Sequence, residues 1–95
     1  MSELLNLEPK GLWKHFDKIC SIPHPSKHEE KIVAALVEFA KENNIEYKLD
    51  EVGNVIMRKP ATKGMENRKG VILQAHCDMV PQKNNDTKHD FLTDP

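Results

Sequence analysis

Aromatic side chains are scarce and scattered in this chain, with one Trp, one Tyr and three Phe among 95 residues. Such a set offers no stacking platform for nucleic-acid bases. Charge of one sign is not in excess either, because 14 basic and 15 acidic side chains give a net charge of −1. We therefore expect no nucleic-acid partner and no electrostatic attraction to a membrane surface.

Long apolar runs and cysteines are also few. No run approaches the length of a membrane span, and Met1–Leu5 lacks the basic segment and apolar core of a secretory signal. The two cysteines, Cys20 and Cys77, lie far apart and form no disulfide framework. We expect both to be free thiols in a reducing cytoplasm. The length allows one small domain with a modest core.

Two helices are predicted in the first half of the chain. Leu7–Pro9 is typical of a helix start, and apolar residues then recur with helical spacing until the prolines of Ser21–Pro25 end the helix. Ser26 and Glu29 fit a capping box that begins a second helix. Its apolar face is formed by Ile32, Val33, Leu36, Val37, Phe39 and Ala40.

A small sheet is predicted after the helices. Ile45, Tyr47 and Leu49 alternate with polar residues, which favours a half-buried strand, and the turn at Val52–Asn54 leads into a return strand at Val55–Arg58. The segment 70–76 is apolar on both faces and is predicted to lie inside the same sheet. The expected fold class is α/β, with two helices on one side of a small sheet.

The residues most typical of a functional site come directly after this last predicted strand, at His76 and Asp78. Side chains alternate along a strand, so these two residues share one face and Cys77 points to the other. A neutral imidazole is a metal ligand, and a nearby carboxylate can hold its second N–H and fix the tautomer. The alternative is a hydrogen-bonded pair without a metal. Cys77 is expected to be a small buried hydrophobe.

Several blocks of sequence carry a family resemblance over essentially the whole chain. They are Ile19–Ser26, Val52–Val55, Arg58–Thr62, Gly64–Lys69 and Leu73–Asp86, the last of which contains the His-Cys-Asp-Met-Val-Pro run. The chain closely resembles the amino-terminal part of the bacterial aminoacyl-histidine dipeptidases, which belong to the superfamily of two-zinc aminopeptidases, carboxypeptidases and aminoacylases. The His-x-Asp triplet alone would be a weak signal.

The resemblance implies that His76 ligates one zinc ion and that Asp78 is an active-site carboxylate orienting this imidazole. It implies a parent enzyme with two zinc ions, or other divalent metals, that hydrolyses dipeptides with a carboxy-terminal histidine and forms homo-oligomers. Residues 1–95 would then be the first segment of the catalytic domain. The other ligands, the general base and the second domain would lie downstream of Pro95.

Because the other metal ligands and the general base would lie downstream, we predict that the 95-residue chain alone is inactive. A zinc ion that activates water and polarises a peptide carbonyl usually has three protein ligands and an open position. A different interpretation is a non-catalytic module that binds a partner through an unpaired sheet edge.

Other polar residues are expected to have structural or solvent-exposed roles. A metal cluster of distant histidines would need coincidental convergence of His15, His24, His28 and His89. Glu29 and Glu30 open a helix, and Lys63, Arg68 and Lys69 lie in a polar loop. We assign none of these residues to catalysis.

Overall fold

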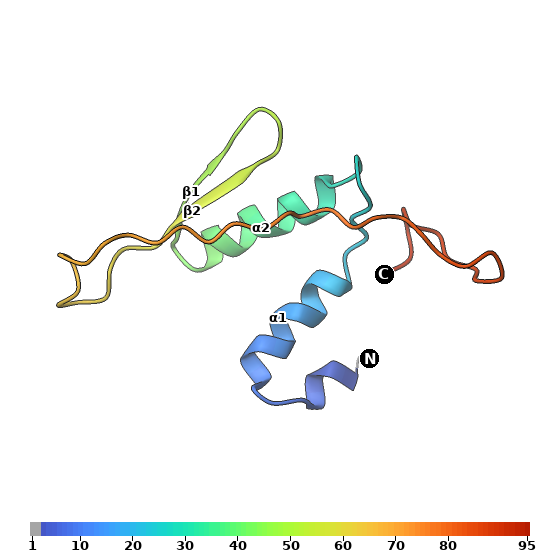
Figure 1. Cartoon of the computed structure of the whole chain (residues 1–95), viewed down its shortest axis with the longest axis horizontal. Coiled ribbons are helices and arrows are strands. Elements are labelled where there is room, and N and C mark those ends of the chain that lie inside the picture. Colours follow the sequence, from blue (N-terminus) through green and yellow to red (C-terminus); the bar gives the residue numbers. More distant parts are fainter. Residues whose placement is uncertain (1–2) are drawn as a thin grey trace. The chain divides into compact units, whose positions relative to one another are not determined.

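The computed structural model describes residues 3–95 (Figure 1). Two helices and a small antiparallel sheet confirm the predicted fold class. The chain divides into two compact units, one containing the residues up to Ile32 together with Asp78–Pro95, and the other Val33–Cys77. None of the described helices combines the length and apolar character of a membrane span. The elements are η1 (Glu3–Asn6), α1 (Lys10–Cys20), α2 (Glu30–Glu42), β1 (Glu46–Leu49) and β2 (Val55–Arg58).

Helix α1 begins after Pro9, as the sequence predicts, and is preceded by the short 3-10 helix η1. The indole N–H of Trp13 donates to the carbonyl of Glu8 at 3.2 Å, and the ring packs edge-on against Phe16. The hydroxyl of Ser21 donates to the Lys18 carbonyl at 2.7 Å and so satisfies one of the free carbonyls at the helix end. The apolar face of α1 stays exposed, at Leu12, Phe16 and Ile19.

Helix α2 starts later than the sequence predicts, and the prediction of a capping box at Ser26 and Glu29 is wrong. The helix begins at Glu30. Lys27, which would be the first helical residue after a Ser26 cap, has a φ of 73° and is therefore not helical. The Ser26 hydroxyl donates to Asp78 instead. Three described residues are buried, namely Pro25, Ile32 and Ala40, and two of them belong to α2.

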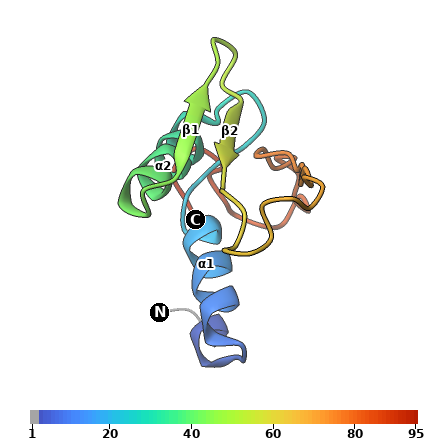
Figure 2. The same cartoon turned by 90° about the vertical axis from the view of Figure 1, so that its left-hand side faces the viewer.

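Strands β1 and β2 form the expected antiparallel hairpin, with Glu46 opposite Arg58 and Leu49 opposite Val55 (Figure 2). The prediction that the first strand is half-buried is wrong, because Tyr47 and Leu49 are exposed. Met57 and Val55 on β2 are partly covered. The two-stranded sheet therefore forms through its backbone ladder and its turn rather than through a buried face.

The turn of the hairpin is organised by Asp50. Its carboxylate accepts the backbone N–H groups of Val52 at 3.0 Å and Asn54 at 2.7 Å, and the side-chain amide of Asn54 at 2.8 Å. These bonds, the Asn54 side chain first, lower the pKa of Asp50 below its ordinary value of 3.8. Gly53 has a φ of 94°, which a residue with a Cβ rarely adopts.

The segment at residues 70–76 is not the inner strand that its sequence predicts. Among the described residues, the sheet contains β1 and β2 alone. Val71, Ile72 and Leu73 are 82, 92 and 93% exposed. A strand exists only where a neighbour accepts its hydrogen bonds, and among the described residues no strand pairs with Val71–Leu73. We call Val71–Leu73 the apolar run.

The Asp50 turn predicts a local dependence on pH. Because the folded pKa is lowered, the carboxylate stabilises the turn above the unfolded pKa, near pH 4, and this contribution is lost as the pH falls through the still lower folded value. We expect the Asn54 side-chain amide signals in NMR spectra to move toward unfolded values below pH 4. In the Asp50→Asn variant these signals should not titrate; an identical titration there would contradict the assignment.

The apolar run predicts self-association of the chain. Contiguous exposed apolar surface and unpaired backbone favour contacts between copies. Sedimentation velocity over a range of concentrations should show oligomers that Leu73→Lys reduces. Lys69→Ser, at an exposed position of the preceding loop, is the matched control and should behave as the original chain does. A monomeric sample that melts cooperatively at high concentration would refute this prediction.

Candidate functional site

Asp78, a predicted site residue, is held by a residue far away in the sequence. Its Oδ2 accepts a hydrogen bond from the Ser26 hydroxyl at 2.5 Å, across 52 positions of the chain. Both side chains are half-buried. A bond from a hydroxyl to a carboxylate is short and is stronger than a bond between neutral groups. The carboxylate is thus tied to the segment that precedes α2.

Backbone bonds support this contact on both sides. The N–H of Ser26 donates to the Met79 carbonyl at 3.0 Å, and the N–H of Met79 donates to the His24 carbonyl at 2.9 Å. Together they make an isolated parallel bridge between Pro25 and Met79. We call this pairing of residues 24–26 with residues 78–79 the clamp. All its members lie in one compact unit.

His76, the predicted metal ligand, is exposed at the end of the other compact unit. Cys77 beside it is a half-buried free thiol, and Cys20 is an exposed one. Within residues 3–95 no three His, Cys, Asp or Glu side chains gather so as to hold a metal ion. A zinc site with three protein ligands therefore does not fit the described residues by themselves.

The remaining candidate residues are dispersed. The Nδ1 atom of His24 lies 2.5 Å from the Ile22 carbonyl, and His89 packs edge-on against Phe91. His15 is exposed on α1, and Glu30 lies in the first turn of α2, where a carboxylate suits the helix dipole. The basic residues of the predicted loop are all exposed, namely Lys63, Arg68 and Lys69.

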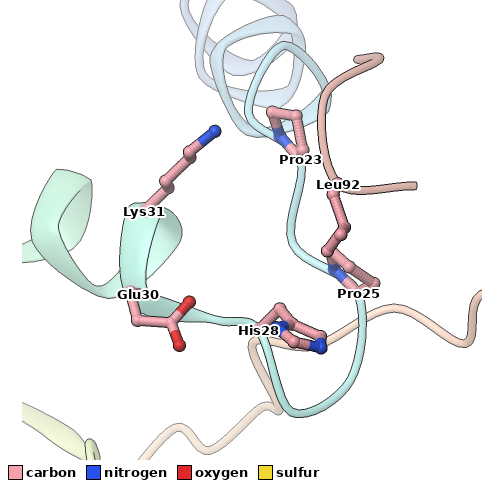
Figure 3. Close-up of a pocket in the computed structure, with 6 residues that line it drawn as sticks. All are labelled: Pro23, Pro25, His28, Glu30, Lys31 and Leu92. Carbon is pink, nitrogen blue, oxygen red and sulfur yellow. The ribbon is translucent and has the colours of Figure 1, made fainter. Parts of the chain in front are cut away.

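A small open pocket of about 240 Å³ lies before and around the start of α2. In Figure 3, the apolar side chains of Pro23, Pro25 and Leu92 lie on one side of it, and Glu30 and Lys31 lie on the other. His28 completes its lining. Neither His76 nor Asp78 lines this pocket, and we assign it no function.

Sequence reasoning missed the role of Ser26 in the site. The residue lies before a helix and has a glutamate three positions later, which is the ordinary signature of a cap. Its true partner is 52 residues away. No local spacing encodes such a contact, and only the fold could reveal it.

Comparison with known proteins gives two close similarities. The chain is 63% identical over all 95 residues to the cytosol non-specific dipeptidase of Escherichia coli (strain K12), of which it covers 20%. The crystal structure of aminoacylhistidine dipeptidase from Vibrio alginolyticus matches 99% of the chain with a TM-score of 0.92 and 61% identity; the chain covers 19% of that protein. No protein-family model matches the sequence. The chain spans about one fifth of the length of either relative.

Proposed function

We propose that this chain serves as the amino-terminal segment of the catalytic domain of a metal-dependent dipeptidase. The observation that supports this most is the similarity to two dipeptidases, at 63 and 61% identity, along essentially the whole chain. The matched region includes the His76–Asp78 stretch and the clamp. Both relatives are about five times longer than the chain, so the activity itself is a property of a larger protein.

Within that enzyme, His76 is the proposed zinc ligand and Asp78 the active-site carboxylate that accepts the second N–H of its ring. The chemistry of the two groups supports these roles. A neutral imidazole binds zinc, and a carboxylate that accepts its second N–H fixes the tautomer of the imidazole and raises its basicity. The described residues supply too few ligands for a complete site. The chain alone is therefore expected to be inactive, and two zinc ions or other divalent metals would be bound by the complete enzyme.

The proposed substrates are dipeptides, including those with a carboxy-terminal histidine. One relative is named for aminoacylhistidine substrates and the other as non-specific, so a broad specificity fits both names. A cytoplasmic location is proposed from the cytosolic relative and from the free thiols. The complete enzyme is proposed to be a homo-oligomer, with neither nucleic acid nor membrane as a partner.

The rival proposal is a non-catalytic module that binds a partner through an unpaired sheet edge. The exposure of the apolar run favours it, because such surface is typical of interaction sites. The dipeptidase proposal accounts for the same exposure, since an enzyme five times longer has further chain to cover it.

Activity tests the proposal most directly. The 95-residue chain should not hydrolyse carnosine or alanyl-alanine. A chimera in which the chain replaces the matching fifth of the E. coli dipeptidase should hydrolyse dipeptides, and His76→Ala should lower kcat by at least about 100-fold, since it removes a proposed zinc ligand. His15→Ala, on the exposed face of α1, is the matched control. An inactive chimera with normal folding would contradict the proposal, as would full activity of the His76→Ala chimera.

A zinc titration separates the proposal from a freestanding metal module. A freestanding metal module would gain about 2.7 kcal/mol of stability at a zinc concentration 100-fold above its Kd. We expect no saturable one-to-one binding of zinc to the 95-residue chain in calorimetry, and no rise in its unfolding midpoint. Tight binding that is lost in the His76→Ala variant would instead favour a self-sufficient metal module.

A further inference from the structure

The segment at residues 70–76 has the backbone of a strand but belongs to no sheet. It contains no helix, turn or bend, and every residue in it is exposed. Among the described residues with a side chain beyond hydrogen, only Lys27 and Asn44 have a positive φ. The segment therefore keeps to the negative φ values of extended chain, and Figure 1 draws it as an extended trace.

An extended segment of this kind is stabilised by a second strand. Its N–H and C=O groups form ladder bonds only with a neighbouring backbone, and its apolar side chains need a face to pack against. Proteins commonly protect an exposed strand with charged side chains or proline. Residues 70–76 contain no Lys, Arg, Asp, Glu or Pro, so the segment lacks these barriers to pairing.

The segment is complementary to itself when two copies run antiparallel. Residues directly opposite each other in an antiparallel pair lie on the same face. With Leu73 opposite Leu73, each Val71 lies opposite Ala75, and all these apolar side chains share one face. A register shifted by one residue would place Leu73 opposite Gln74 and bring a polar amide into that face.

Charge favours the antiparallel direction over the parallel one. Arg68 and Lys69 are exposed directly before the segment. In a parallel pair in register, Lys69 would lie about 5 Å from Lys69 of the second copy, and like charges directly opposite each other are destabilising. In the antiparallel pair centred on Leu73, the two lysines are about 27 Å apart. That distance exceeds the screening length of about 8 Å at physiological ionic strength.

We propose that residues 70–76 are a self-recognition surface, which pairs with the same residues of a second copy as an antiparallel strand centred on Leu73. The proposal specifies the contact, direction and register of the self-association that the apolar run predicts, and it does not depend on the proposed dipeptidase function. A two-stranded ribbon is marginally stable in water. The dimer is therefore expected to form reversibly and to dissociate on dilution.

Paired charge substitutions at the centre test the register in the 95-residue chain. Leu73→Lys and Leu73→Glu each place two like charges opposite each other, and each should raise the dimer Kd in sedimentation equilibrium at least about tenfold. An equimolar mixture of the two variants should dimerise again, because Lys then faces Glu. Leu73 is 93% exposed, so these changes leave the fold of one copy intact. Leu12→Lys, on the exposed face of α1, is the matched control and should dimerise as the original chain does.

A second pair of variants tests the strand direction. Val71→Lys mixed with Ala75→Glu should dimerise more tightly than either variant alone, whereas Val71→Lys mixed with Val71→Glu should not. The reverse preference would show a parallel pair and overturn the proposal. A chain that stays monomeric at all concentrations, association that Leu73→Lys leaves unchanged, or failure of the Leu73 mixture to dimerise would overturn it too. So would loss of association in Leu12→Lys, which would place the interface on α1.

Discussion

The clamp is the constraint that holds Asp78 in place. One compact unit of the chain is assembled from two segments separated by more than forty residues of sequence, and the clamp joins them through two backbone bonds and the Ser26–Asp78 bond. In a parallel bridge the central residue of one strand need not donate, because the bonds go to its two neighbours. Pro25 occupies that central position, so its missing N–H costs the pairing nothing.

Little of the chain's apolar surface is buried. Pro25, Ile32 and Ala40 are the buried positions among the described residues, while the apolar face of α1 and the apolar run remain open to water. Burying a large aliphatic side chain contributes about 1.5–3 kcal/mol to stability. The exposed side chains of the apolar run do not contribute this free energy to the described structure. The solved relative matches 99% of the chain and is about five times its length.

The sequence predicted the features that depend on residues close together in the chain. The Pro9 start of α1 and the polar turn of the hairpin were readable, because proline fixes φ and because Gly53 tolerates a positive φ. The segment at residues 70–76 has the composition of an inner strand, but composition cannot supply the neighbour that a strand requires. Its sequence therefore predicts a position inside a sheet, whereas the described residues contain no strand that pairs with it.

The candidate site was predictable to the same extent. His76 and Asp78 could be singled out from their alternation and from the family resemblance, whereas the contact that holds Asp78 could not. Ser26 satisfied a cap signature that uses only four residues, and nothing within those four competes with it. The competitor lies 52 positions away, and a strong bond to a carboxylate outweighs a cap that would require Lys27 to be helical.

His76 and Asp78 also differ in how far contacts with other residues fix their side chains. His76 is exposed, while Asp78 is half-buried and bonded to Ser26. A side chain that must be ordered on binding consumes part of the binding energy. The hydrogen bond from Ser26 restricts the Asp78 side chain with atoms from one compact unit. The Asp78 carboxylate is thus already ordered by a contact among the described residues.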